Sequence, residues 1–336
     1  MGDLLSYLSG ANVQRESLLG VGMRDRFQGS GERMKEETRS FYRDAVTQTA
    51  ARIIDELDRE LDLTAMARDV AMSSFHFHRI FRGMLGETPK QLQRRLRMER
   101  AAWQLVNSSA DVTTIAFDAG YNSHEGFTRA FHKLYGAPPS TYRDERSCQI
   151  QRPPVRLPAI CGLHFDDGLS VTRLRFITGE EQMNVDIVSI ENKRVATTRH
   201  IGPYHQIAKA FETLGAIAGP AGLFVEGAST IALYYDDPET TDPTELRSDA
   251  GVTIASDASL PEGLSEQEID GGKYAKMVHR GSYASIGNSW SRLMGEWLPD
   301  SGERHEEERV CFELYVNNPM QVPEEELLTE LYLPLS

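Results

Sequence analysis

The chain has 336 residues, of which 40% are hydrophobic, 26% charged and 8% aromatic, a composition typical of folded proteins long enough for two or three domains. Three scattered cysteines, Cys148, Cys161 and Cys311, exclude a disulfide framework and a Cys-x-x-Cys metal site, so we expect a reducing compartment. No uncharged apolar stretch approaches the roughly 18 residues of a membrane span, and residues 1–20 lack the features of a signal peptide. We therefore expect a cytoplasmic protein with no membrane partner.

The net charge of −14 is unevenly distributed along the chain. Residues 1–150 carry 21 Lys and Arg against 20 Asp and Glu, a net charge of +1, whereas residues 151–336 carry 15 against 30, a net charge of −15. Within residues 71–150 the balance is 11 basic to 7 acidic residues. Because phosphate contacts depend on local charge, the acidic total does not exclude nucleic acid as a partner of the first half.

In chain order, four segments differ in pattern. Residues 1–40 are rich in Gly, Ser and mixed charge, and we expect a flexible extension. Residues 41–146 show apolar residues at helical spacing throughout, and residues 147–182 contain three prolines and are expected to be a linker. Residues 183–336 alternate like strands, with two helical segments. The predicted fold is therefore multidomain, with an all-α N-terminal half and an α+β C-terminal half.

The helical half contains an internal duplication with an offset of 50 residues. Each copy predicts a short helix (63–70; 113–119), a tight turn and a longer helix opened by a serine (74–85; 123–135). In the longer helices an apolar stripe at i, i+3, i+4 and i+7 spacing faces the core, formed by Phe77, Ile80, Phe81 and Met84 and by Phe127, Ala130, Phe131 and Leu134. The opposite faces are rich in donors, as a helix that lies in a major groove requires, although a solvated surface would look the same for either helix alone.

The second copy carries a family signature. The run Ile115-Ala116-x-x-Ala-Gly120-Tyr121-x-Ser123 continues through Phe127, Arg129, Phe131 and Gly136 to Tyr142-Arg143, and it resembles the signature of the AraC/XylS family of transcription regulators. The resemblance implies two helix-turn-helix subdomains joined by a long helix, about 89–107, which sets both reading helices on one face of the duplex. It also implies double-stranded DNA as a partner.

The resemblance assigns candidate DNA contacts by position. They are Phe75, His78 and Arg79 in the first reading helix and His124, Glu125 and Arg129 in the second. Arg82 lies on the same polar face of the first helix, and the basic cluster of Arg94 and Arg95 on the joining helix is a candidate backbone contact. Glu125 departs from the small or amide residues common there; it could accept from a cytosine amino group or weaken that contact. His76 and His78 point apart on a helix and have no neighbouring ligand, so we expect no metal site.

The second half is also duplicated. The residues of His200-Ile-Gly202-Pro-Tyr204 recur as His279-Arg-Gly281-Ser-Tyr283, with an offset of 79 that slips to 81 further on. Each copy predicts strand, helix, strand, strand, which in the first copy are residues 195–200, 204–217, 229–235 and 251–255. Two such β-α-β-β units that pair about a pseudo-dyad would leave a cleft between them, a common place for ligands.

One carboxylate interrupts an apolar strand of the second copy. Strand alternation over 310–316 puts Glu313 beside Tyr315 in a segment that is otherwise apolar or aromatic, and the equivalent residue in the first copy is Ala232. A buried and unpaired carboxylate is costly, so Glu313 should be solvated, protonated or paired with a cation. An exposed Glu on an open sheet face is the alternative.

The segment around this carboxylate carries a second resemblance. Phe312-Glu313-Leu-Tyr315-x-Asn-Asn-Pro319, with the two Gly-x-Tyr copies, is similar to the GyrI-like effector-binding domain over residues 183–336. The resemblance implies a small-molecule effector, and in multidrug-sensing members a Glu that pairs with lipophilic cations. By position Glu313 is the charge partner, and Tyr315, Trp290, Tyr283 and Tyr204 are candidate walls. Trp290 and Phe211 share a helical stripe and could equally belong to the core.

Together these patterns predict a one-component transcription regulator without a cofactor. Occupancy of the pocket would change either DNA affinity or contact with RNA polymerase. We expect no enzyme, because the chain shows no Gly-x-Ser-x-Gly, no evident Cys-His pair and no metal triad. Two alternatives stay open: a GyrI-like hydrolase of small electrophiles that uses Glu313 as general base, and a DNA-binding protein with a vestigial pocket.

Overall fold

The computed structural model describes residues 25–147, 157–166, 169–172, 174–177, 183–236 and 241–336. The described chain forms two compact units. The first comprises residues 41–66 and 81–177, and the second comprises residues 25–40, 67–80 and 183–336. Most of the expected extension and parts of the expected linker lie outside the described residues.

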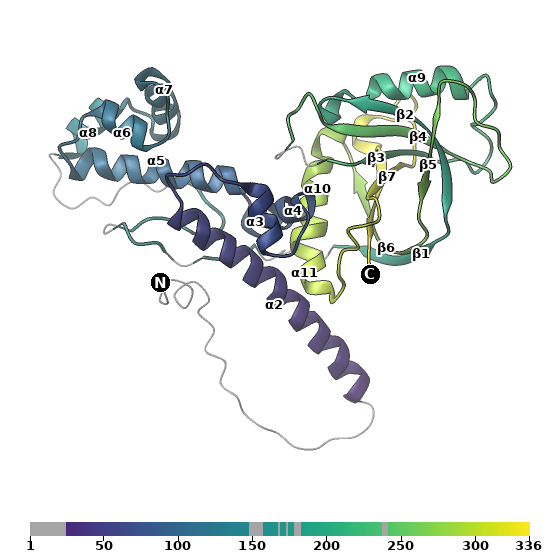
Figure 1. Cartoon of the computed structure of the whole chain (residues 1–336), viewed down its shortest axis with the longest axis horizontal. Helices are drawn as coiled ribbons and strands as arrows, with labels where there is room; N and C mark the ends of the chain where they lie inside the picture. The colour runs from purple at the N-terminus through teal and green to yellow at the C-terminus, as the bar shows by residue number, and fades with distance from the viewer. Residues whose placement is uncertain (1–24, 148–156, 167–168, 173, 178–182, 237–240) are drawn as a thin grey trace. The chain divides into compact units, whose positions relative to one another are not determined.

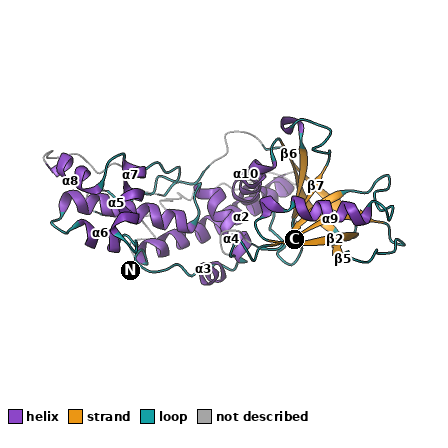
Figure 2. Ribbon diagram, turned by 90° about the horizontal axis from the view of Figure 1, so that it is seen from above, coloured by secondary structure: helices purple, strands orange, loops and turns teal. Residues whose placement is uncertain are grey.

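Helices make up the described N-terminal half (Figures 1 and 2). They are α2 (Asp25–Asp55), α3 (Leu63–Asp69), α4 (Ser74–Leu85), α5 (Pro89–Asn107), α6 (Val112–Asp118), α7 (His124–Tyr135) and α8 (Pro139–Ser147). The two predicted short-helix and long-helix pairs are α3–α4 and α6–α7, and α5 is the predicted joining helix. Residues 25–40, which the sequence analysis assigned to the flexible extension, belong to α2 in the structure.

Local capping explains where α5 and α7 begin. The side chain of Thr88 accepts from the backbone N–H of Gln91 at 3.2 Å, and the side chain of Gln91 accepts from the N–H of Thr88 at 2.9 Å, a capping box followed by Pro89. Ser123 accepts from the N–H of Gly126 at 3.1 Å, as its position before α7 predicts. These bonds satisfy amide donors that a helix start otherwise leaves unpaired.

The second helix-turn-helix packs on α5 through one apolar core. Buried residues of α5, α6, α7 and α8 form this core: Met98, Ala101, Ala102, Leu105, Ile115, Ala116, Phe127, Phe131 and Tyr142. The turn between α6 and α7 passes through Gly120 at φ +81°, where a Cβ would also clash with the guanidinium of Arg97. The predicted stripe of α7 thus faces the core in its Phe127 and Phe131, while Leu134 is exposed.

The segment expected as a linker packs into the first unit where the structure describes it. Leu157, Cys161, Leu163 and Phe165 are buried, and Phe165 pairs with Val171 in an isolated bridge. The backbone N–H of Ile177 donates to the carbonyl of Met84 at 2.8 Å. The linker expectation was therefore wrong for the described part of this segment, residues 157–166, 169–172 and 174–177, because it packs apolar side chains into the first unit.

An eight-stranded antiparallel sheet organises the second unit. Its strands are β1 (Val185–Ile190), β2 (Lys193–Ile201), β3 (Thr230–Tyr234), β4 (Arg247–Ile254), β5 (Ser265–Ile269), β6 (Gly272–Arg280), β7 (Phe312–Tyr315) and β8 (Leu328–Pro334). Its helical segments are η1 (Tyr204–Gln206), α9 (Ala208–Ala218), η2 (Tyr283–Ser285), α10 (Ile286–Arg292), the π-helical turn η3 (Leu293–Trp297), α11 (Leu298–Ser301) and η4 (Glu324–Glu326). Helix α9 lies over β2 and β4 through Ala210 and Leu214 (Figure 1).

The strand order has the predicted pseudo-dyad. The order β1-β6-β8-β7-β3-β4-β2-β5 becomes its own reverse when β1 to β4 exchange with β5 to β8. The dyad passes between the central strands β3 and β7, where Ala232 pairs with Glu313. The first strands are exchanged between copies, since β1 pairs with β6 and β5 pairs with β2. This exchange buries each copy's edge against the other copy.

The α+β C-terminal half and the helical N-terminal half are both as predicted. None of the helices in the described part of the chain combines the length and the apolar character that crossing a bilayer would require.

Candidate functional site

The second unit holds a buried carboxylate at its pseudo-dyad. Glu313 on β7 is only 3% exposed. Its Oε1 accepts from the indole Nε1 of Trp290 at 2.8 Å, and its Oε2 accepts from the hydroxyls of Tyr234 and Tyr315 at 3.0 Å each. The expected alternative of an exposed Glu on an open sheet face was therefore wrong.

Aromatic rings surround these donors in symmetric pairs. Tyr204 packs edge-on against Tyr234 at 4.8 Å between ring centroids, and its pseudo-symmetric counterpart Tyr283 packs edge-on against Tyr315 at 5.4 Å. Phe211 reaches the other side of Tyr315 at 5.5 Å. Tyr283 is 38% exposed, so the cluster meets solvent at this ring. The structure thus brings all five predicted ligand-binding residues into one cluster.

Tyr234 is the member of the cluster that the sequence analysis did not assign to the site. It is the counterpart of Tyr315 under the 81-residue repeat, and the two hydroxyls lie 3.3 Å apart over the same carboxylate oxygen. The repeat was therefore the signal that could have identified it. Because Glu313 lies next to the dyad opposite Ala232, the site has twofold phenol donors around one carboxylate.

The protonation of this cluster follows from its burial. Burial raises the pKa of Glu313, and the hydrogen bonds from Trp290, Tyr234 and Tyr315 oppose that rise, as does the charge of Arg79. Burial and the neighbouring carboxylate hold the pKa of Tyr234 well above its usual value, and burial with the second phenol does the same for Tyr315. The phenols are therefore neutral donors, and the charge of Glu313 is the one that a ligand would meet.

The reading face of the second helix-turn-helix is open to solvent. His124, Glu125 and Arg129 on α7 are all exposed, while Phe127 and Phe131 are fully buried beneath them. The helix thus separates a donor-bearing face from a core face, as predicted. The structure brings these three candidate DNA contacts together on one element.

The first reading helix presents its equivalent face differently. Arg82 is exposed, but Phe75 and Arg79 are half-buried and His78 is 2% exposed. The guanidinium carbon of Arg79 lies 4.4 Å from the ring centroid of Phe75 and 5.3 Å from that of Trp290. In this arrangement α4 does not offer His78 to a groove, so the expectation of a base contact from it is not met here.

Comparisons with known proteins match the two halves separately. Residues 66–145 match a helix-turn-helix domain model, and residues 183–336 match the GyrI-like small molecule binding domain. A DNA gyrase inhibitor of Yersinia enterocolitica is 34% identical over 141 residues, which are 40% of this chain and 88% of that protein. The chain belongs to the GyrI-like family through its C-terminal domain and carries an AraC-type helix-turn-helix domain before it. Its domain content is thus that of a DNA-binding regulator with a ligand-binding domain.

Other relatives and solved structures cover the same share of the chain. A DNA gyrase inhibitor of Escherichia coli K12 is 33% identical over 140 residues, or 87% of its length. The EcmrR–DNA complex superposes with a TM-score of 0.40 at 19% identity, over 46% of this chain and 57% of that chain. The C-terminal domain of EcmrR gives a TM-score of 0.41 at 20% identity, over 46% of this chain and 99% of that domain.

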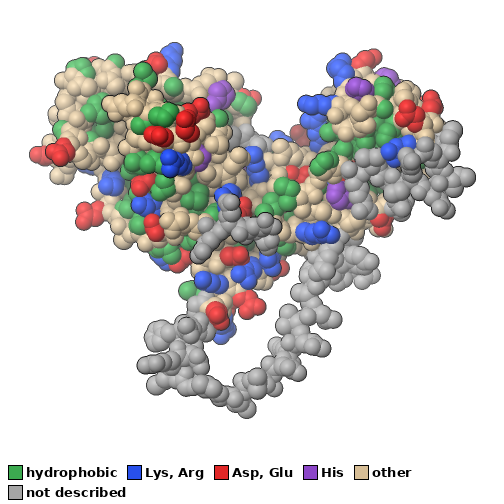
Figure 3. Space-filling view, turned by 180° about the vertical axis from the view of Figure 1, so that it is seen from behind, with side chains coloured by type: hydrophobic (Ala, Val, Ile, Leu, Met, Phe, Trp, Pro, Cys, Tyr) green, Lys and Arg blue, Asp and Glu red, His purple; other side chains and the backbone are tan. Residues whose placement is uncertain are grey.

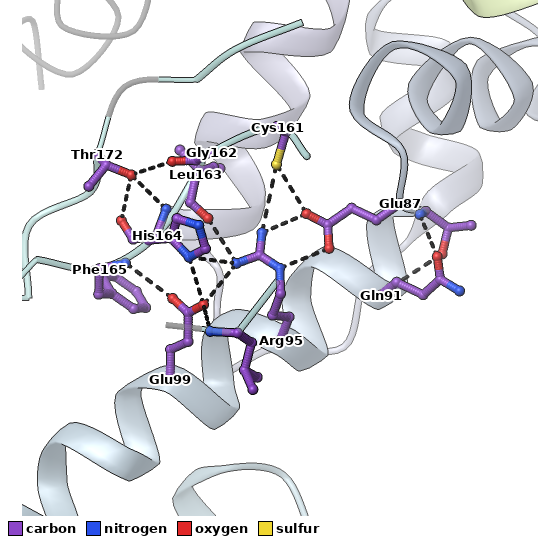
Figure 4. A network of polar contacts seen from close by, with 12 residues as sticks. Glu87, Gln91, Arg95, Glu99, Cys161, Gly162, Leu163, His164, Phe165 and Thr172 are labelled. Atoms are coloured by element: carbon purple, nitrogen blue, oxygen red, sulfur yellow. Dashed lines mark hydrogen bonds and ion pairs between the residues drawn. The ribbon is translucent and has the colours of Figure 1, made fainter. Parts of the chain in front are cut away.

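Two adjacent arginines of the AraC-type domain differ sharply in environment. Arg94 is exposed on α5, whereas Arg95 is 8% exposed and pairs with Glu87 at 2.5 Å and Glu99 at 3.1 Å (Figure 4). Glu99 also bonds Nδ1 of His164 at 2.8 Å, so α5 and the returning segment share one ion network. Arg95 is therefore a structural residue, and the expected backbone contact was wrong for it because both carboxylates already hold its guanidinium.

A small polar cluster connects α4 to the GyrI-like domain within the second unit. Glu307 Oε1 and Oε2 accept from the backbone N–H of Ser73 at 3.0 and 2.8 Å, and Glu307 Oε1 lies 2.9 Å from Nδ1 of His76. Ligand atoms of His76, Glu307 and His305 lie within 4.8 Å of one another, the spacing of a possible metal site. The premise that His76 has no neighbouring ligand was therefore wrong, because His305 and Glu307 reach it from far along the chain.

Charge is mixed over the surface. Figure 3 shows Lys and Arg side chains interspersed with Asp and Glu on the face drawn.

Proposed function

We propose that the chain is a cytoplasmic transcription regulator that binds specific double-stranded DNA through both helix-turn-helix elements and senses a lipophilic organic cation at Glu313. The buried carboxylate supports this proposal most directly. Its three hydrogen-bond donors, the Trp290 indole and two phenols, are all neutral. An ionised carboxylate held by neutral donors gains most from a cation, and surrounding aromatic rings favour an organic one.

The geometry also supports the choice between ligand classes. An anionic ligand would meet the charge of Glu313 and a half of the chain with a net charge of −15. A small hydrated cation would make no cation–π or apolar contact with the rings of Tyr204, Tyr283 and Phe211. A cation with apolar groups satisfies both the carboxylate and the rings.

Calorimetry with tetraphenylphosphonium tests the proposal. Glu313→Gln should weaken binding at least tenfold, since it removes a charge-assisted interaction of about 1.5–3 kcal/mol. The exposed Glu324→Gln removes the same charge from η4 and should leave the affinity unchanged. Equal affinity of the Glu313→Gln and Glu324→Gln variants would refute a role for Glu313 in cation binding.

DNA binding is tested separately. A duplex is selected from a random pool with the full chain, and binding of the selected duplex is measured at stated salt concentrations. We propose that RNA polymerase contact is the output of this binding, which in vitro transcription from the selected site would detect.

The hydrolase alternative uses the same carboxylate. The raised pKa of Glu313 would suit a general base, and this is the observation that favours it. Multiple turnover of a small electrophile that disappears in Glu313→Gln would support hydrolysis. Stoichiometric binding without turnover supports sensing.

A further inference from the structure

We propose that the first reading helix is self-inhibited: Glu307 and Trp290 of the GyrI-like domain hold the DNA-contacting face of α4, and a cation at Glu313 releases it. This inference rests on the proposed function and adds its regulation. The contacts lie inside one compact unit, because residues 67–80, with the first half of α4, belong with residues 183–336.

Glu307 covers the N-terminal turn of α4. A reading helix approaches DNA with its N-terminal turn, and backbone N–H groups there bind phosphate oxygens. In this chain the carboxylate of Glu307 takes that place, accepting from the N–H of Ser73 at 2.8 Å and bonding His76 at 2.9 Å. Burial raises the pKa of Glu307, but the hydrogen bonds from His76 and Ser73 outweigh it and hold the pKa below its usual value. The carboxylate is therefore ionised and imitates a phosphate.

The reading face of α4 is covered as well. Arg79, the counterpart of Arg129 in the duplication, lies over the ring of Trp290 at 5.3 Å. His76 is 3% exposed and packs edge-on against His305 at 4.6 Å between ring centroids. A helix must expose this face to enter a major groove about 12 Å wide. The corresponding face of α7 is exposed, so the two copies of one DNA-binding unit are in different states.

Trp290 links this contact to the ligand site. The same Trp290 ring that lies beneath Arg79 donates its N–H to Glu313 at 2.8 Å. A bound cation competes with Arg79 for the negative field of Glu313. It also competes with the carboxylate of Glu313 in orienting the indole of Trp290. A ligand that binds more tightly once Arg79 has left the ring of Trp290 stabilises the released state of α4. DNA must stabilise the same state.

His76, His305 and Glu307, whose ligand atoms are spaced as in a metal site, form part of the contact between α4 and the GyrI-like domain. Both oxygens of Glu307 already accept from the N–H of Ser73, which precedes α4, and Oε1 also bonds His76 on α4. The tests below therefore include a chelator, so that adventitious metal ions do not strengthen the contact.

The test compares two neighbouring carboxylates in the full chain. Glu307→Gln removes the phosphate-like charge from α4, whereas Glu308→Gln makes the same change at an exposed neighbour. Without cation, Glu307→Gln should bind the selected duplex about tenfold more tightly than Glu308→Gln, and tetraphenylphosphonium should then add less to its affinity than it adds to the wild type. Amide hydrogen exchange at residues 73–77 should speed up in Glu307→Gln alone.

Two results would overturn the inference. Equal duplex affinity of the Glu307→Gln and Glu308→Gln proteins would do so, and so would unchanged exchange at residues 73–77 in a folded Glu307→Gln protein. Both readouts are taken without cation, so they do not depend on the ligand assignment. If instead the wild type binds no cation while Glu307→Gln binds DNA more tightly, the proposed ligand fails and the self-inhibition stands.

Discussion

At the scale of single residues, Glu313 is the one carboxylate at the pseudo-dyad because the two copies differ at this position. Its partner across β3 and β7 is Ala232, the same position in the other copy of the repeat. Two carboxylates at this pair would lie side by side in a buried site and repel each other. One carboxylate, with phenols from both copies, is therefore an arrangement that a duplicated domain can form only by departing from symmetry.

The protonation of Glu313 makes stability depend on pH. Burial raises its pKa in the folded chain, so the protonated form stabilises the fold at low pH and this contribution is lost as pH rises through the raised value. Glu313→Gln should therefore match the wild type near pH 4 and have the higher free energy of unfolding at pH 8. Urea unfolding at a series of pH values measures this difference. A wild type that gains stability relative to the variant as pH rises would contradict the assigned direction.

The same ionisation should control ligand affinity. A cation binds the ionised form, so binding expels a proton wherever Glu313 is still protonated, and affinity should increase with pH through the raised pKa. Calorimetry of tetraphenylphosphonium in two buffers of different ionisation enthalpy detects the released proton. Tyr234→Phe and Tyr315→Phe each remove one donor to Oε2 and should move this transition to higher pH by similar amounts. Affinity that is flat with pH in all three proteins would contradict the role of Glu313.

Arg94 and Arg95 provide a matched pair on one helix. Arg95→Met leaves Glu87 and Glu99 buried without their cation and should lower the free energy of unfolding by about 3–5 kcal/mol. Arg94→Ala should leave stability within about 0.5 kcal/mol and reduce the salt dependence of DNA binding by about one phosphate contact. Chemical unfolding and salt-dependent gel shifts separate the two effects. Reversed outcomes would mean that Arg95 faces DNA.

At the scale of elements, local chemistry made the helices predictable. The serine cap of α7, the proline start of α5 and the stripe of Phe127 and Phe131 are local signals. Each depends only on residues within or directly beside its own helix. The exchange of β1 and β5 between the copies had no such signal, because it depends on pairing far along the chain. The return of residues 157–166 onto α5 was also missed, since the buried residues of this segment lack a regular period.

The candidate site divides in the same way. Glu313 and its phenol Tyr315 were predictable from strand alternation and the repeat, and both hydrogen-bond each other in the structure. The covering of α4 was not predictable, because Glu307 lies 234 residues from Ser73 and nothing near either residue indicates the contact. Duplicated reading helices have equal sequence signals even where the fold places them in different environments.

The reading helices predict unequal sensitivity to equivalent substitutions. Arg129→Ala should weaken specific DNA binding by about 1–3 kcal/mol with little effect on folding, because its side chain is exposed. Arg79→Ala should both weaken DNA binding and reduce the inhibition, so its net effect without cation should be smaller. Competition gel shifts of both variants with the selected duplex measure the difference. A smaller loss for Arg129→Ala than for Arg79→Ala would contradict the open state of α7.

At the scale of the whole molecule, the chain combines two domains that are each built from a duplicated unit. The AraC-type domain contributes two reading helices, and the GyrI-like domain contributes one carboxylate on its pseudo-dyad. Trp290 contacts both Glu313 and Arg79, so the proposed regulation requires no separate transmission element between the ligand site and α4. The size of the coupling is then set by how much better each ligand binds once α4 is free.

The most direct test of this account is reciprocal linkage in the full chain. The dissociation constant of tetraphenylphosphonium is measured with and without saturating selected duplex, and that of the duplex with and without saturating cation. The account predicts that each ligand tightens the other by the same factor, at least about fivefold, and that Glu313→Gln abolishes both changes. Two binding constants that are independent of each other in the wild type would contradict it.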